Sequence, residues 1–211
     1  EIYRPIKVTY PDGTFAKKAY EDAQNKILVW DENGHGMEYA YDAFGNLERV
    51  IRGDTQDKTI YSYDFANQIT KITSPLGYKT SFQNNLLGQR LNKTQPNGDQ
   101  EQFIYDAAGN LIKHINYENK NILYSYDELG RVLTQTYADP KENISYEYDQ
   151  GFNALGKLSK VMDPSGTTEF TYNQLGLITT EKKTLGPDVF TTQYDYDNTG
   201  LLQSITYPAV Y

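Results

Sequence analysis

Pairs of aromatic residues separated by a single residue recur along the chain, as in Tyr39-Ala40-Tyr41 and Tyr124-Ser125-Tyr126. This period of two places both rings on one face of an extended strand. Each pair is followed by a short turn-forming segment and then by residues rich in Leu, Ile, Val and Thr, such as 47–51 and 132–137. The pattern therefore predicts a series of β-hairpins, each with an aromatic strand, a turn and an aliphatic strand.

The hairpins follow a longer pattern, Tyr-x-Tyr-Asp-x-x-Gly-Asn/Arg-Leu/Val, which residues 39–47 show in full. With the second aromatic as the mark, the units lie at Tyr20 (imperfect), Tyr41, Tyr63, Phe82, Tyr105, Tyr126, Tyr148, Tyr172 and Tyr196. Steps of 19 to 24 residues between these marks are typical of repeat arrays. We expect one array over residues 1–211, with no separate second domain.

The repeated positions are interpreted as structural, because Asp bonds its own backbone in tight turns and Gly supplies a positive φ. Asn67 replaces Gly in its unit, and Asn also enters the left-handed region readily. The Tyr148 unit has four extra residues before Gly156, and the Phe82 unit has Gln83 for Asp and two extra residues before Gly88. These insertions indicate a loop. The signature residues are Tyr41, Asp42, Gly45, Tyr63, Asp64, Asn67, Tyr105, Asp106, Gly109, Tyr126, Asp127, Gly130, Tyr148, Asp149, Gly156, Tyr172, Gly176, Tyr196, Asp197 and Gly200.

In the second strand of each hairpin, the apolar residues often stand three positions apart, as in Leu47/Val50 and Leu158/Val161. Strict alternation would place such residues on opposite faces. Either a β-bulge resets the register, or neighbours partly cover both faces. A helix is disfavoured, because these segments are short and β-branched.

Composition agrees with a wide sheet of many strands and argues against a compact enzyme core. The chain has 20 Tyr and 8 Phe, yet only 38% of its residues are hydrophobic, and its mean hydropathy is −0.71. Tyrosine is therefore expected to pack where Leu and Val pack elsewhere. About sixteen strands would make a flat sheet roughly 75 Å wide. Because sheets of that width curl, split or close, we predict an all-β fold of tandem hairpins in a curved, spiralling antiparallel sheet.

The motif Tyr-x-Tyr-Asp-x-x-Gly-Asn/Arg-Leu, with a following turn of the Asp-Pro-x-Gly type, resembles the YD repeat of Rhs proteins, Tc-toxin B and C components and teneurins. The resemblance covers roughly residues 8–207. It implies a segment of a longer repeat array that spirals into a hollow shell. In bacterial members such a shell encloses a C-terminal toxin, and in teneurins it supports a cell-surface receptor. Export from the cell is implied in the same way.

Candidate chemical groups have simpler interpretations as turn residues. The Asp-Pro pairs at 139–140 and 163–164 fit turns better than the self-cleaving segment that the resemblance implies. Residues 31–36 with Asp42 imitate a calcium loop poorly, because Asn33-Gly34 is itself a hairpin-turn signal. His35 and His114 lie in different units, so a metal site or a base is not expected. The recurrent carboxylates are also expected to build turns.

Composition further limits the partners. The absence of Cys excludes disulfides and Cys-based zinc sites. The formal net charge of −8 disfavours nucleic acid and anionic membranes. We therefore expect no enzyme and no cofactor, but a wall segment of a shell around a C-terminal toxin or effector. The alternative is a surface whose tyrosines bind a glycan or a receptor; against it stands the expectation that tyrosines one repeat apart stack on each other and are half-buried.

Overall fold

The protein, analysed as a computed structural model, consists of antiparallel β-strands. The structure describes residue 4 and residues 6–208. These residues form 19 strands and two single-turn 3-10 helices, Asp22–Gln24 and Pro140–Glu142. The predicted all-β class is confirmed. The chain divides into two compact units, residues 1–102 and 103–211, with the boundary inside β10.

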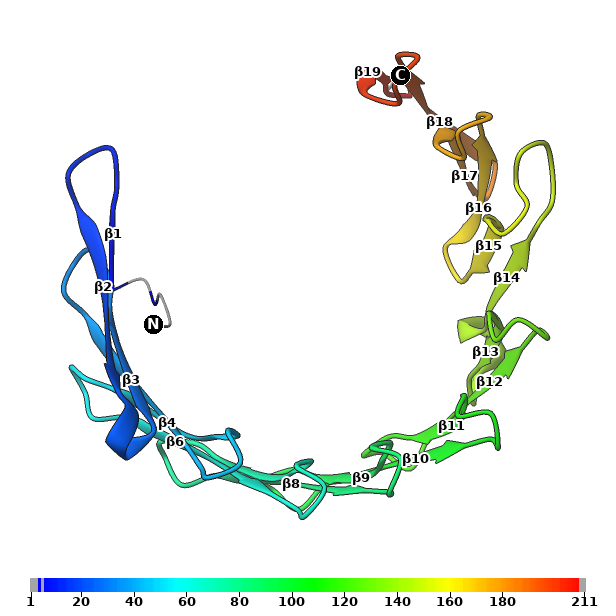
Figure 1. The fold of residues 1–211 in the computed structure, drawn as a ribbon. Helices are drawn as coiled ribbons and strands as arrows, with labels where there is room; N and C mark the ends of the chain where they lie inside the picture. The colour runs from blue at the N-terminus through cyan, green and yellow to red at the C-terminus, as the bar shows by residue number, and fades with distance from the viewer. Residues whose placement is uncertain (1–3, 5, 209–211) are drawn as a thin grey trace. The chain divides into compact units, whose positions relative to one another are not determined.

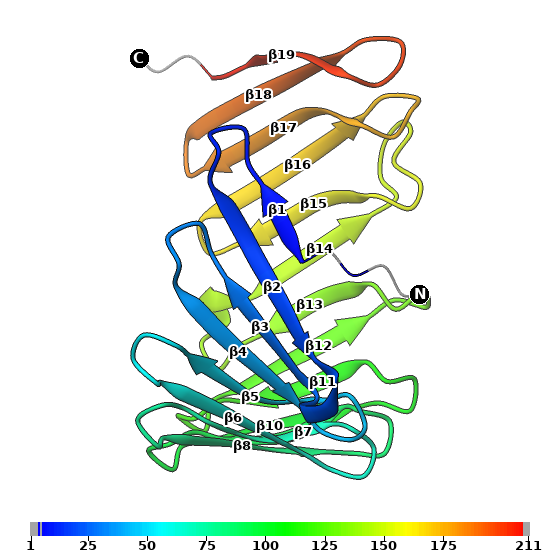
Figure 2. The same cartoon turned by 60° about the vertical axis from the view of Figure 1, so that its left-hand side comes forward.

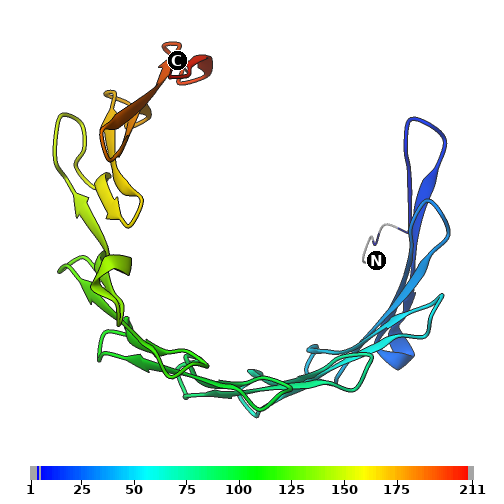
Figure 3. The ribbon, with the colours of Figure 1, turned by 180° about the vertical axis from the view of Figure 1, so that it is seen from behind.

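The first unit is a meander in which each strand pairs with the next one along the chain. The pairing runs from β1 to β9 and on to the first half of β10, and it is antiparallel throughout. Within this unit the strands form a single layer (Figures 1 and 3). Its strands are β1 (Lys7–Thr9), β2 (Phe15–Glu21), β3 (Lys26–Trp30), β4 (Gly36–Tyr41), β5 (Leu47–Arg52), β6 (Lys58–Tyr63), β7 (Ile69–Thr73), β8 (Lys79–Asn84), β9 (Arg90–Thr94) and the start of β10 (Gln100–Tyr105).

The second unit repeats the same arrangement. From β11 to β19 each strand again pairs antiparallel with the next. Figure 2 shows its strands side by side in chain order. They are β11 (Leu111–Ile115), β12 (Asn121–Tyr126), β13 (Val132–Thr136), β14 (Ile144–Tyr148), β15 (Leu158–Asp163), β16 (Gly166–Tyr172), β17 (Ile178–Leu185), β18 (Asp188–Tyr196) and β19 (Leu202–Thr206).

A β-bulge explains the three-residue spacing of apolar residues in the second strand of the hairpins. Tyr41 pairs with Leu47, but the preceding Ala40 pairs with Arg49, so one residue of β5 is left over. Leu47 and Val50 consequently lie on the same face as the tyrosines of β4. The same register shift occurs before Tyr63, Asn84, Tyr126, Tyr148, Tyr172 and Tyr196.

The register gives each unit one aromatic and aliphatic face and one more polar face. Tyr39 is opposite Ile27 on one side and opposite Val50 on the other, and all three are half-buried. Tyr61 is likewise opposite Ile72. The expected stacking of tyrosine on tyrosine is wrong for these rings, because their cross-strand partners are aliphatic side chains, whereas the expected half-burial is confirmed for both.

Very little of the described chain is fully buried. The buried hydrophobic residues are Ala40 and Ala154, and the buried polar residue is Ser159. A sheet one layer thick leaves both faces open, so its side chains are covered only by neighbours in the same sheet. Stability must therefore come from contacts along the sheet, between strands of one hairpin and between successive hairpins, as in other repeat proteins.

Candidate functional site

The signature residues gather at the turns that follow the aromatic strands. Asp42 shows the common geometry: its Oδ1 accepts hydrogen bonds from the backbone N–H groups of Phe44 (2.9 Å) and Asn46 (2.8 Å). The backbone closes the same five residues, since Asp42 N–H donates to the Asn46 carbonyl and Gly45 N–H to the Asp42 carbonyl. We call these segments the YD turns: Asp42–Asn46, Asp64–Gln68, Asn85–Gln89, Asp106–Asn110, Asp127–Arg131, Asn173–Leu177 and Asp197–Leu201, with a longer variant at 149–157.

The fourth residue of each five-residue YD turn lies in the left-handed region of the Ramachandran plot. Gly45 has a φ of 85°. Asn67 takes the same place with a φ of 59°, which confirms the predicted backbone requirement for Gly or Asn there. The carboxylate of Asp42 has a lowered pKa, because the Asn46 side chain and the turn N–H groups donate to it. The Asp42 carboxylate therefore acts as the hydrogen-bond acceptor that closes the turn.

The Phe82 unit has a different register from the one predicted. Asn85, not Gln83, holds the turn position, because its Oδ1 accepts from the N–H groups of Leu87 and Gln89 (both 3.0 Å). Asn84 consequently occupies the place of the second tyrosine, and the unit has no extension before Gly88. The prediction failed because it used an aromatic as the mark. The spacing Asn85-x-x-Gly88, which matches Asp-x-x-Gly, was the signal that could have revealed the register.

The predicted insertion in the Tyr148 unit is present, and it changes the role of the aspartate. Asp149 lies at a φ of 64°, and its N–H donates to the carbonyl of Lys157 across the longer loop. Its Oδ1 accepts from the N–H of Gly156 at 2.6 Å. The carboxylate therefore still closes the turn, but this turn is longer than the five-residue form.

In three repeats the second tyrosine of the motif bonds to the preceding hairpin. The strands β5 and β6 pair only from Arg49 opposite Ile60 to Ile51 opposite Lys58, so the carbonyl of Leu47 lies beyond their ladder. The hydroxyl of Tyr63 donates to that carbonyl at 2.8 Å. Tyr126 and Tyr172 donate in the same way to the carbonyls of Leu111 (2.8 Å) and Leu158 (2.6 Å), and the amide of Asn84 donates to that of Ile69 (3.1 Å).

These hydroxyls lie at the fork between successive hairpins, where neighbouring strands separate and a backbone carbonyl has no partner in the ladder. A bulge sits just before each fork, where the two strands stop pairing. Burial raises the pKa of Tyr63, Tyr126 and Tyr172 above the usual value, which keeps each hydroxyl protonated as a donor. Tyr63, Tyr126 and Tyr172 thus connect hairpins through their hydroxyls, a polar function that the sequence pattern alone did not predict.

The residue after the motif glycine connects consecutive YD turns. The Asn46 side-chain amide donates to Asp42 in its own turn (3.0 Å) and to Asn67 in the following turn (2.8 Å). The Gln68 amide donates to the Asn85 carbonyl at 3.2 Å. The recurrence of a polar residue after Gly was visible in the sequence, but its partner lies a whole repeat away.

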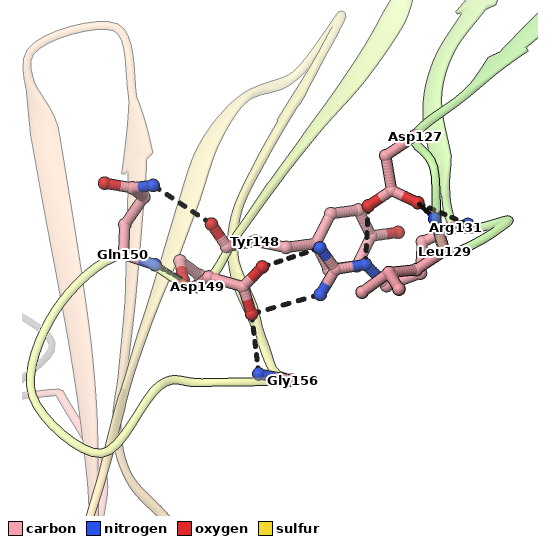
Figure 4. Close-up of polar contacts among 8 residues, drawn as sticks. Asp127, Leu129, Arg131, Tyr148, Asp149, Gln150 and Gly156 are labelled. Carbon is pink, nitrogen blue, oxygen red and sulfur yellow. Dashed lines mark hydrogen bonds and ion pairs between the residues drawn. The ribbon is translucent and has the colours of Figure 1, made fainter.

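Arg131 makes the strongest of these connections (Figure 4). Its Nε donates to Asp127 Oδ2 at 2.7 Å, while its two terminal nitrogens donate to both oxygens of Asp149 at 3.1 and 2.6 Å. The guanidinium also lies 4.4 Å from the centre of the Tyr148 ring. Bonds with Arg131 lower the pKa of both carboxylates, and the two carboxylates raise the pKa of the guanidinium. A planar fork suits such a bidentate bridge better than an ammonium would.

Most of the other sequence candidates are also turn residues, and His114 lies in strand β11. Asp31 Oδ1 accepts from the N–H groups of Asn33 (2.9 Å) and His35 (2.8 Å), so this segment closes a turn as predicted. Asp139 and Asp163 accept from the N–H groups two residues on, which confirms the turn interpretation of both Asp-Pro pairs. His114 stacks on Phe103 with ring centres 4.6 Å apart.

Among the residues that the structure describes, no group of three or more His, Cys, Asp or Glu side chains could hold a metal ion. In the same residues no helix is long and apolar enough to cross a membrane. The signature side chains bond to backbone and to neighbouring turns. The arrangement thus defines a class of protein: a tandem array of β-hairpins whose repeated residues build and connect the repeats.

Comparison with known proteins identifies the family. The family model described as teneurin YD-shell matches residues 11–186, and the chain belongs to this family. It is 26% identical over 207 residues to a double-stranded DNA deaminase toxin A of Burkholderia cenocepacia, covering 89% of this chain and 14% of that protein. It is 30% identical over 173 residues to a tRNA nuclease WapA of Bacillus subtilis, covering 67% of this chain and 7% of that protein.

Solved structures share the fold. The chain matches a crystal structure of TcdB2-TccC3 with a TM-score of 0.74 at 16% identity, covering 97% of this chain and 13% of the matched chain. A Tc holotoxin pore of Photorhabdus luminescens gives a TM-score of 0.73, also at 16% identity and with the same coverage. The chain thus spans about a seventh or less of these relatives. The family and the fold together make it a structural shell segment.

Proposed function

We propose that the chain is a non-catalytic wall segment of a shell that encloses a C-terminal toxin or effector of its polypeptide for delivery to other cells. The observation that carries this proposal is the use of the signature side chains. Asp42, Tyr63 and Arg131 all form bonds that close turns or connect hairpins. Side chains that are bonded within turns and between hairpins hold the repeats together and are not free to act on a substrate. This use of polar groups fits a wall segment.

The names of the relatives support an enclosed cargo. One is a deaminase toxin, another is a tRNA nuclease, and each matches this chain over a small part of its length. The activity in such a name belongs to that whole protein. For this chain we propose two partners, the neighbouring repeats and an enclosed toxin or effector. We also propose that the polypeptide is exported to the cell surface or beyond.

The alternative of a glycan- or receptor-binding surface has less support from the tyrosines. Tyr126 and Tyr172 are half-buried, and their hydroxyls bond to backbone carbonyls. Rings that stack on sugars need an open face, and hydroxyls that bond to a ligand need to be free. Glycan binding is therefore kept as one outcome of the test.

The test is limited proteolysis of the natural full-length polypeptide, with mass mapping of the fragments before and after mild unfolding. A shell predicts that a segment downstream of these repeats survives only while the repeats are folded. A polypeptide with Tyr126→Ala and Tyr172→Ala should lose this protection at a lower denaturant concentration than one with the control substitution Tyr117→Ala. A downstream segment that is cut at once in the folded protein would overturn the proposal and direct attention to glycan screening.

Catalysis by this segment is tested separately. The chain alone should not deaminate double-stranded DNA and should not cleave DNA or tRNA above the rate of buffer. An activity that Asp127→Asn abolishes while the fold is kept would contradict the assignment as a non-enzyme.

A further inference from the structure

Two Asn-Gly pairs occur in the chain, Asn33-Gly34 and Asn97-Gly98, and both lie in turns at the hairpin ends opposite the YD turns. In each pair the asparagine is exposed, and the glycine has a positive φ, 82° at Gly34 and 92° at Gly98. At neither glycine would an added Cβ meet another atom within 4 Å. The space around the glycine is therefore equally open in the two pairs.

The two turns also share one backbone form. At residues 31–35 the first N–H donates to the fifth carbonyl, and the fourth N–H donates to the first carbonyl, both at 3.1 Å. At residues 95–99 the same two bonds measure 2.8 and 2.9 Å. What distinguishes the two asparagines is therefore the bonding of their side chains.

In the first turn an aspartate leaves the asparagine side chain unbonded. Asp31 Oδ1 accepts from the N–H groups of Asn33 (2.9 Å) and His35 (2.8 Å), so the N–H groups inside the turn are already satisfied. In the part of the chain that the structure describes, the Asn33 side chain itself makes no hydrogen bond. The Asn33 amide can therefore rotate about its side-chain bonds without breaking a contact.

In the second turn the asparagine side chain replaces that aspartate as the acceptor. The turn begins with Gln95, whose amide donates to Glu101 at 3.5 Å instead of entering the turn. Asn97 Oδ1 accepts from the Asp99 N–H at 3.1 Å, and Asn97 Nδ2 donates to Asp99 Oδ2 at 2.7 Å. Both polar atoms of the Asn97 amide are thus held by Asp99.

We propose that Asn33 is a site of spontaneous deamidation and isomerisation to isoaspartate, and that the bonds to Asp99 protect Asn97 from the same reaction. The backbone nitrogen of Gly34 attacks Cγ of Asn33. The new N–Cγ bond forms and the Cγ–Nδ2 bond breaks, while the proton of the Gly34 nitrogen passes to the departing ammonia. Water then opens the cyclic imide at either carbonyl, which gives aspartate or isoaspartate, and no electron is transferred.

The geometry separates the two sites because the attack requires the asparagine side chain to turn toward the next nitrogen. Glycine, which has no Cβ, hinders this approach least. The N–H bond of the glycine must open in both turns, so it does not distinguish them. At Asn97 the rotation must also break two side-chain hydrogen bonds, each of which contributes to holding the amide in place.

The products would alter this turn in charge and in length. Aspartate at position 33 adds a carboxylate next to Asp31 and Glu32, and like charges at short range repel. Isoaspartate adds a carbon atom to the main chain and so changes the spacing of the hydrogen-bonding groups in the turn. The inference concerns a single turn and does not depend on the enclosed cargo.

The test incubates the whole protein at mildly alkaline pH, both folded and in urea, and follows the two asparagines by peptide mass spectrometry with chromatographic separation of aspartate from isoaspartate. The rates in urea account for the different flanking residues. Folding should slow Asn97 at least about fivefold more than it slows Asn33, which is the usual contribution of one hydrogen bond. Asp99→Ala should raise the folded rate at Asn97 about fivefold and leave Asn33 unchanged.

Asp57→Ala, an aspartate of another turn, serves as the matched control and should change neither rate. A variant that unfolds would bring both asparagines to their rates in urea, so an unchanged rate at Asn33 also reports an intact fold. Conversion of neither asparagine in the folded protein would overturn the proposal. Equal slowing of both sites by folding, or no effect of Asp99→Ala on Asn97, would show that the side-chain bonds protect nothing.

Discussion

The two ends of the hairpins differ in what their turns do. Most YD turns have one five-residue form, and side chains such as Asn46 and Arg131 connect each turn to the next. Some turns at the opposite ends, which we call the far turns, have the same five-residue form, as at residues 31–35 and 116–120. Others differ in length, from the two-residue Gly186-Pro187 connection to the longer segment between Tyr137 and Asn143. Side-chain bonds in far turns close within one turn, as Asp163 does with Ser165.

The tips of the turns also differ. YD turns expose large apolar side chains, such as Phe44 at 82% and Leu129 at 75% of full exposure. Several far turns place Pro, Asn, Glu or Ser at the tip, although Leu76 and Tyr117 are exposed there as well. This comparison teaches that one end of the repeat holds the array in register, while the other end only reverses the chain.

The largest expected effect comes from lengthening one turn of each kind in the first unit. A Gly-Ser insertion between Leu86 and Leu87 breaks the bonds from Leu87 and Gln89 to Asn85, and should cost about 2 kcal/mol. The same insertion between Asp54 and Thr55 in a far turn interrupts bonds from Gln56 to the carbonyls of Arg52 and Gly53, but no bond to another YD turn, and should cost about 1 kcal/mol. Urea unfolding followed by Trp30 fluorescence measures both. Equal losses would remove the distinction between the ends.

Removal of a connecting tyrosine should have the next largest effect. Tyr126→Ala loses a half-buried ring and the bond to the Leu111 carbonyl, and should destabilise the second unit by about 1.5 kcal/mol. Tyr126→Phe, which keeps the ring but removes the hydroxyl, should destabilise the unit by about half as much. Calorimetry of both variants against Tyr117→Ala, an exposed far-turn residue, checks the order. A Phe variant as stable as the wild type would show that the hydroxyl connects nothing.

Restoring the motif in the divergent unit should stabilise it. Asn84→Tyr replaces an amide that already reaches the Ile69 carbonyl with a ring and a hydroxyl, and we expect a gain of about 1 kcal/mol. Gln83→Tyr, on the other face of the same strand, serves as the control and should change the free energy of unfolding by less than about 0.5 kcal/mol. A gain for Gln83→Tyr as large as that for Asn84→Tyr would show that the effect does not depend on the place of the second tyrosine.

The smallest effect is the pH dependence of the Arg131 connection. In the folded state the backbone N–H of Arg131, and after it the guanidinium, lower the pKa of Asp127, while the guanidinium lowers the pKa of Asp149. The contribution of the guanidinium is therefore present above the unfolded pKa of about 4 and is lost as the pH falls through the folded values. Arg131→Gln should therefore lower the unfolding midpoint at pH 7 and make little difference at pH 2. Lys141→Gln in a far turn should show no such dependence. A deficit for Arg131→Gln that persists undiminished in acid would contradict the ionic account.

The sequence predicted the hairpins, the turn roles of Asp42 and Gly45 and the bulge as one of two alternatives, because these depend on neighbouring residues. It did not predict the bond from Tyr63 to Leu47 or the bridge from Arg131 to Asp149. Each joins residues of different repeats, 16 or 18 positions apart, and depends on how two hairpins are placed. The register at Asn84 was missed because the Asn84 amide bonds to the carbonyl of the preceding hairpin, where other repeats use a tyrosine hydroxyl.

The most direct test of the central claim is native-state hydrogen exchange on the two insertion variants. If YD turns connect the hairpins, the insertion after Leu86 should raise exchange about tenfold in its own hairpin and also in the preceding β6–β7 hairpin, which Gln68 connects to Asn85. The insertion after Asp54 should raise exchange only near residues 52–57. Spreading of the effect from both insertions, or from neither, would contradict the claim that one end of the repeat couples the array.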